Sequence, residues 1–109
     1  MPIRKPDELA PLGRFSQPSI LVLASLAGGS KHGYAIMQDV REFHGSRMEP
    51  GTLYGALSRL ERQGWIEPLS ADDRRRPYRL TAAGADVLRQ HLSGLKRMVS
   101  IGLHRLEAD

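Results

Sequence analysis

Apolar residues recur at helical spacing along much of the chain, in stretches that glycine and proline separate. In residues 16–27 a serine and an early proline precede an almost continuous apolar run, and two glycines follow it. In residues 34–44 apolar side chains stand three or four positions apart, namely Ile36, Met37, Val40 and Phe43. These patterns predict two consecutive helices, and the first should be buried on more than one side because it is apolar almost all round.

The segment from Glu49 to Trp65 predicts a third helix with two different faces. Pro50 suits the first helical position, where its missing N–H loses no partner, and Gly64 suits the end. One narrow face carries three leucines: Leu53, Leu57 and Leu60. The other faces carry small or polar residues and arginines: Gly51, Thr52, Tyr54, Gly55, Ser58, Arg59 and Arg62. We interpret this surface as a DNA-recognition helix that fits the major groove, although a solvated face of an ordinary helix would have the same composition.

Two short extended segments, residues 65–69 and 77–80, follow the third helix, and their prolines suit a sheet edge or a strand end. The polar sequence SADDRRR joins them, which predicts a hairpin. The far side of this hairpin carries three arginines: Arg74, Arg75 and Arg76. Beside a recognition helix they favour contact with phosphates or the minor groove, whereas taken alone they would indicate a solvated charge run that Asp72 and Asp73 partly neutralise.

Thr81 is a suitable N-cap for a last helix that continues without proline to about Glu107. Along it, apolar and small residues alternate steps of three and four, the heptad spacing of a helix that packs along another helix: Ala85, Leu88, Leu92, Leu95, Val99, Gly102 and Leu106. At about 1.5 Å per residue this helix is close to 40 Å long, more than two short helices and a hairpin cover. We therefore expect a homodimer with the large members of this stripe at its interface: Leu88, Leu92, Leu95, Val99 and Leu106.

Together these elements predict a mainly α fold with a small β-hairpin. We expect a flexible N-terminal arm in residues 1–15, a winged helix-turn-helix in residues 16–80 and a dimerisation helix in residues 81–109. Tyr34, at the start of the second helix, is either a core residue with its hydroxyl at the surface or a phosphate contact. The net charge of +4 over 109 residues permits a double-stranded DNA partner. The alternative is a winged helix used only for protein–protein contact, without sequence-specific DNA binding.

The sequence gives little support to other classes of function. It contains no cysteine, which excludes disulfides, Cys-type zinc sites and thiol catalysis. Its four histidines lie on separate predicted elements or on separate faces of the last helix, so we expect no metal site, no cofactor and no enzyme activity. Apolar runs are too short to span a bilayer and no apolar signal region is present at the start, so we expect a cytoplasmic protein without a membrane partner.

Four motifs resemble the PadR family of bacterial transcriptional regulators: HGYAI at 32–36, GTLY at 51–54, ALSRLERQGWI at 56–66 and YRLTAAG at 78–84. The resemblance covers residues 18–92 and implies a winged helix-turn-helix, a homodimer held by the C-terminal helix and, for most members, repression of a neighbouring operon. A two-fold dimer in turn predicts a palindromic operator. For many members the resemblance also implies release by a small aromatic or phenolic effector. Two positions depart from the family pattern, since Gly55 stands where proline is common and Pro77 where an aromatic or other strand residue is usual.

Overall fold

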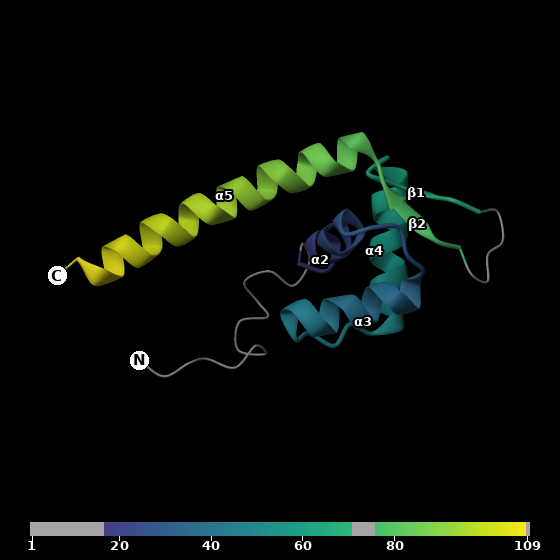
Figure 1. Cartoon of the computed structure of the whole chain (residues 1–109), viewed down its shortest axis with the longest axis horizontal. Coiled ribbons are helices and arrows are strands. Elements are labelled where there is room, and N and C mark those ends of the chain that lie inside the picture. Colours follow the sequence, from purple (N-terminus) through teal and green to yellow (C-terminus); the bar gives the residue numbers. More distant parts are fainter. Residues whose placement is uncertain (1–16, 71–75, 109) are drawn as a thin grey trace.

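The computed structural model describes residues 17–70 and 76–108. Over these residues the chain forms, in order (Figure 1), α2 Gln17–Ala27, α3 Gly33–His44, α4 Pro50–Arg62, β1 Ile66–Pro68, β2 Tyr78–Leu80 and α5 Ala82–Glu107. The predicted mainly α fold with a small β-hairpin is confirmed. The predicted N-terminal arm, residues 1–15, and two arginines of the predicted wing, Arg74 and Arg75, lie outside the described residues.

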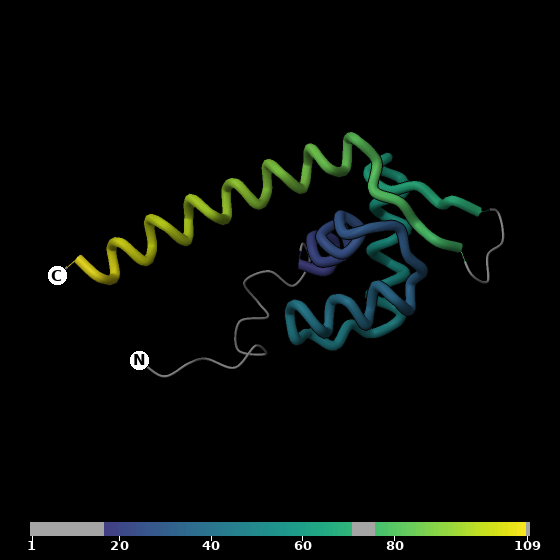
Figure 2. Tube along the Cα trace, viewed as in Figure 1, coloured from purple at the N-terminus to yellow at the C-terminus, as the bar shows by residue number. Residues whose placement is uncertain are grey.

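Helix α2 occupies the centre of the domain. It packs against α3, α4, α5 and β2, and in Figure 2 its tube lies between those of α3 and α5. Val22 and Leu23 are fully buried, and Leu53, Leu57 and Leu60 of α4 belong to the same core. A fully buried leucine contributes about 1.5–3 kcal/mol relative to an exposed one, so hydrophobic burial is what holds α4 on α2. The prediction that the first helix is buried on more than one side is confirmed.

A short connection, residues 45–49, turns the chain from α3 into α4. Gly45 adopts a left-handed conformation with φ 81°, and its N–H donates to the carbonyl oxygen of Arg41, which closes α3. Pro50 then opens α4 as predicted, with extended Glu49 as the N-cap. Phe43 shares the apolar spacing of α3 but is half exposed. Residues 41–45 are all exposed, so the last turn of α3 extends past the core.

The hairpin pairs β1 with β2 in antiparallel register, Ile66 with Leu80 and Pro68 with Tyr78. Both strands are shorter than predicted because Trp65, Leu69 and Pro77 lie just outside the ladder. Lys31, in the loop between α2 and α3, adds a bridge to the other edge of β2: its N–H donates to the Tyr78 carbonyl (3.2 Å) and its carbonyl accepts from the Tyr78 N–H (3.0 Å). The wing is thereby attached to the helical part of the domain through its backbone.

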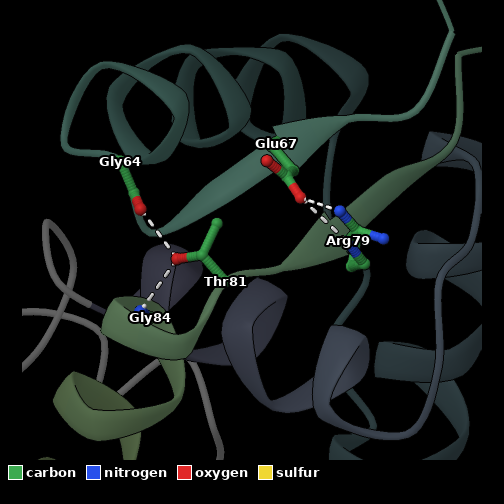
Figure 3. Close-up of polar contacts among 5 residues, drawn as sticks. All are labelled: Gly64, Glu67, Arg79, Thr81 and Gly84. Carbon is green, nitrogen blue, oxygen red and sulfur yellow. Dashed lines mark hydrogen bonds and ion pairs between the residues drawn. The ribbon is translucent and has the colours of Figure 1, made fainter.

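Thr81 and Gly84 fix the start of α5 on the end of α4 (Figure 3). The Thr81 hydroxyl donates to the Gly64 carbonyl (2.7 Å) and accepts from the Gly84 N–H (3.1 Å), so the predicted N-cap is confirmed. The Thr81 N–H donates to the Trp65 carbonyl (3.1 Å). Gly64 has φ 78°, a left-handed conformation that favours glycine and lets the chain leave α4 sharply.

Helix α5 leaves the domain after its first two turns. Gly84 and Leu88 are buried, whereas every large apolar residue from Leu92 onward is exposed. The helix gives the molecule its long dimension, 57 Å against 27 and 20 Å, and Figure 1 shows it running away from the other elements. None of the helices within residues 17–70 and 76–108 combines the length and the apolar character that crossing a membrane requires.

Candidate nucleic-acid interface

The two faces of α4 separate as the sequence predicts. Leu53, Ala56, Leu57 and Leu60 are buried. The outward residues of the helix are exposed, apart from a half-buried Gly55: Gly51, Thr52, Tyr54, Ser58, Arg59 and Arg62. Within residues 17–70 and 76–108, a methyl group added at Gly51 would meet no atom within 4 Å, and one at Gly55 would meet only Nη1 of Arg59 at 3.4 Å. The first turns of α4 therefore expose backbone and mostly small side chains to solvent, and Arg59 and Arg62 form a basic surface at the end of the helix.

Close packing of α3 on α4 positions Tyr54. Gly33, the first residue of α3, is buried, and a methyl group there would lie 3.1 Å from Cδ2 of Leu53 and 3.4 Å from the Tyr54 hydroxyl. The absence of a side chain at Gly33 lets the Tyr54 ring lie against the start of α3 while the residue stays 56% exposed. Its hydroxyl is thus held at the junction of the two helices, where a DNA phosphate could accept a hydrogen bond from it.

Tyr34 lies on the surface of α3. It is 67% exposed, so the interpretation as a core residue is wrong, because α3 directs Ile36 and Val40 inward and leaves position 34 outside that face. Nε2 of Gln38, one turn later, donates to the Tyr34 hydroxyl (3.3 Å). The first two turns of α3 thus expose a tyrosine and a glutamine that are joined by a hydrogen bond.

Arg76 is directed toward α4, which differs from the predicted row of three projecting arginines. Its side chain is only 24% exposed, and its Nη1 lies 3.9 Å from Oε1 of Glu61 on α4. Arg76 therefore links the hairpin to α4. Of the two other wing arginines, Arg74 and Arg75, no position is described. On the strands, Nε of Arg79 donates to Oε1 of Glu67 (2.9 Å) across the hairpin (Figure 3).

A polar cluster around Lys31 secures the turn that leads into α3. Nζ of Lys31 donates to the carbonyl oxygens of Ser25 (2.5 Å) and Gly29 (3.1 Å), which satisfies carbonyls at the end of α2. The same ammonium lies 3.8 Å from Oδ2 of Asp39 on α3, and this oxygen accepts from the buried Ser25 hydroxyl (2.7 Å). The sequence analysis missed this cluster, because its three side chains are polar, widely spaced and outside any motif.

The sequence analysis also missed two exposed residues at the starts of α3 and α4. His32 is the N-cap of α3, and Arg47 lies in the connection just before α4. A basic residue directly before a recognition helix is a signal that could have identified Arg47, since the turn in this motif brings it close to the helix start. Among the residues that the structure describes, no group of three or more His, Cys, Asp or Glu side chains could hold a metal ion. The chemistry available on this face is hydrogen bonding and positive charge.

Comparison with known proteins identifies the family of the chain. The sequence model of the transcriptional regulator PadR-like family matches residues 22–90. The transcriptional regulator Rv3488 of Mycobacterium tuberculosis is 38% identical over 80 residues, which cover 71% of this chain and 74% of that protein. An uncharacterized 37.1 kDa protein in transposon TN4556 of Streptomyces fradiae is 41% identical over 85 residues. These residues are 78% of this chain but only 25% of that relative, so the chain spans about a quarter of its length.

Among solved structures, a PadR family transcriptional regulator from Eggerthella lenta DSM 2243 superimposes with a TM-score of 0.76 at 28% identity, covering 94% of this chain and 92% of that one. The family match covers most of α2, all of α3, α4, β1 and β2, and the start of α5. It therefore includes α3, α4 and the hairpin, which carry the exposed residues described above. The chain therefore belongs to the PadR-like family of transcriptional regulators, which are DNA-binding proteins and not enzymes.

Proposed function

We propose that the chain acts as a homodimer that binds a palindromic operator and represses transcription, with α4 of each subunit in the major groove. The exposed face of α4 is the observation that carries this proposal. It combines a flat first half, where Gly51 and Gly55 allow close approach, with Arg59 and Arg62 at its end. Arginine is the side chain that most often reads guanine in the major groove, through paired hydrogen bonds to O6 and N7.

Each part of the exposed surface takes a different role in this proposal. Thr52, Ser58 and Arg59 face base edges, and Tyr54, Arg62 and Tyr34 contact the phosphates on either side of the groove. Arg74 and Arg75 provide the wing contact with phosphates or the minor groove. Arg76 holds the wing against Glu61 and acts as a positioning residue.

The exposed apolar stripe of α5 supports the homodimer. Leaving these aliphatic side chains in water would expose a large apolar patch for a monomer: Leu92, Leu95, Val99 and Leu106 lie along one side, with Met98 and Leu103 beside them. A two-fold contact through α5 would set the two α4 helices about 34–36 Å apart, or a multiple of that spacing, on one side of the duplex. In this proposal residues 16–80 bind DNA and residues 81–109 form the dimer interface.

Occupancy of an operator within a promoter is sufficient for repression, because the bound dimer blocks access to the promoter. A reporter under the bound promoter should be expressed more strongly when the chain is absent. A panel of phenolic and other small aromatic compounds should show whether one of them lowers operator affinity, as release by an effector requires.

Selection of bound duplexes from random DNA by the purified chain tests the proposal directly. We expect a palindromic consensus, because a two-fold dimer presents the same α4 surface to each half-site. A non-palindromic consensus would contradict the proposal that the chain binds DNA as a two-fold dimer. The affinity for DNA should fall by about 0.9 log units per log unit of salt concentration for each phosphate contacted. If no DNA sequence is enriched and any affinity for DNA does not fall with salt, the alternative of a protein–protein interaction module is favoured.

Arg59→Ala is expected to relax base preference at one position of each half-site. The loss of a paired contact to a base should cost about 1–3 kcal/mol on the preferred base and much less on the others. Binding to a panel of operators substituted one position at a time measures this loss. Arg89→Ala, an exposed arginine of α5, is the control and should leave the preference unchanged. An equal loss on every sequence would make Arg59 a phosphate contact.

Replacing Arg74 and Arg75 together by alanine is expected to weaken binding to every sequence. The plot of log affinity against log salt should become shallower by up to about two units, one for each phosphate contact removed. Arg89→Ala with Arg97→Ala removes the same charge from exposed positions of α5 and should leave the slope unchanged. An unchanged slope in the wing variant would show that these arginines are a solvated charge run.

A further inference from the structure

The part of the α5 stripe that a second chain could cover begins at Leu92. Leu88, one turn earlier, already belongs to the buried core, where α5 packs on α2 of its own chain. Beyond it the free stripe consists of five positions at heptad spacing, ending near the last residue of the helix: Leu92, Leu95, Val99, Gly102 and Leu106. The turn around Leu88 is already covered by α2 of the same chain. A partner helix must therefore pack on α5 between that turn and the end of the helix at Glu107.

The residues that flank this stripe carry positive charge on both sides. In heptad terms the flanking positions on one side are Arg89, Lys96 and Leu103, and those on the other are His91, Met98 and Arg105. No acidic residue occupies a flanking position, so a second α5 helix cannot form complementary ion pairs here. Flanking charges set the orientation and register of paired helices, and the favoured alignment is the one that avoids placing like charges together.

A parallel arrangement is opposed by the fold. Parallel helices in register would bring both helix starts side by side, about 8–10 Å apart. The partner helix would then run along the stripe at Leu88, where α2 of the first chain already lies. His91 would also lie beside Lys96 of the partner subunit on each side of the pair.

Two antiparallel registers fit the heptad pattern, and they differ in charge and length. If the helices crossed at residue 97, Lys96 would face the partner's Lys96, and the partner's Glu107 would reach the turn that α2 covers. If they crossed between residues 100 and 101, Val99 would face the partner's Gly102 and Leu95 the partner's Leu106. Lys96 would then lie beside the partner's Leu103, and Met98 beside the partner's Arg105, so no like charges meet. The partner's helix would end opposite Gly94, before the covered turn.

We propose that two α5 helices cross antiparallel between Ser100 and Ile101, with Gly102 against the partner's Val99 at the closest approach. The proposal rests on the homodimer of the proposed function and adds its register. Within the part of the chain that the structure describes, a methyl group at Gly102 would meet no atom within 4 Å, so no residue there requires a glycine at this position of the stripe. The stems of Lys96 and Arg105 cover the partner's apolar residues while their charges stay in water.

Spin labels test the register, because the chain has no cysteine and single introduced thiols can be labelled without background. Gln90→Cys and His104→Cys place labels at exposed positions on the side of α5 away from the stripe. Along the helix axis the proposed crossing separates the two labels by about 30 Å at position 90 and about 10 Å at position 104. A parallel pair, or a crossing at residue 97, gives equal label separations at the two positions.

We therefore expect the Gln90→Cys dimer to show a clearly longer label distance than the His104→Cys dimer. Equal distances in a dimeric protein would overturn the register and leave the proposed dimer and its DNA binding intact. A monomeric protein, with no distance measured between labels on two chains, would overturn both the register and the proposed homodimer. As a second measurement, Gly102→Trp should raise the dimer dissociation constant about tenfold or more, because the larger side chain overpacks the crossing. Gly94→Trp, which lies off the stripe, is the control and should not raise it. Equal effects of the two substitutions would contradict the proposed crossing.

Discussion

Replacing Gly84 with alanine is expected to lower the free energy of unfolding by about 1–3 kcal/mol or more, the range for overpacking a filled site. The added methyl carbon would lie 2.0 Å from the Trp65 carbonyl oxygen and 2.8 Å from its carbonyl carbon. Both are backbone atoms, so no change of rotamer relieves the overlap. The first turn of α5 must therefore move away from Trp65, which strains the hydrogen bonds that Thr81 makes to Gly64 and Gly84.

Denaturant unfolding of the variant beside the parent chain measures this loss. Gly94→Ala is the matched control, since it adds the same methyl group to the same helix at a position with no atom within 4 Å. The control should gain up to about 1 kcal/mol, because alanine is the better helix former. Equal stability of the two variants would mean that α5 does not sit on Trp65 as closely as the structure describes.

The helices of this fold could be predicted from the sequence because α3, α4 and α5 have a periodic apolar face, α2 is a continuous apolar run, and glycine, proline or a capping residue marks their ends. For α4, Pro50 marks the start and Gly64 the turn after the end, and the three predicted leucines are buried. For α5, the predicted cap at Thr81 and end near Glu107 both agree with the structure. These features depend on residues close together in sequence, for which spacing alone is informative.

Features that depend on residues far apart could not be predicted in this way. The pairing of Arg76 with Glu61 needs the exact position of the hairpin beside α4, and the sequence shows only a run of arginines. The bridge from Lys31 to Tyr78 joins single residues across 47 positions without any repeating pattern. The exposure of Phe43 follows from where the core ends along α3, which periodicity does not encode.

Leu95→Glu combined with Val99→Glu is expected to dissociate the proposed dimer and abolish operator binding. These side chains are 37% and 54% exposed in the single chain, so the monomer should tolerate the change and keep its helical signal. In a dimer the substitutions would place four carboxylates in one apolar seam, and burying an unpaired charge costs several kcal/mol. Sedimentation should show a monomer at concentrations where the parent chain is dimeric.

Loss of operator binding in this variant follows from the loss of the second half-site, because α4 and the wing are unchanged. A single half-site offers one recognition helix and one wing, so we expect the remaining binding to resemble binding to random DNA, which is typically about 10³-fold or more weaker than specific binding. Ser93→Glu with Ser100→Glu is the control: it adds the same charge at exposed positions on the opposite side of α5. The control should stay dimeric and bind the operator. If Leu95→Glu with Val99→Glu also stays dimeric and binds normally, the subunits meet through another surface and the exposed stripe of α5 has a different role.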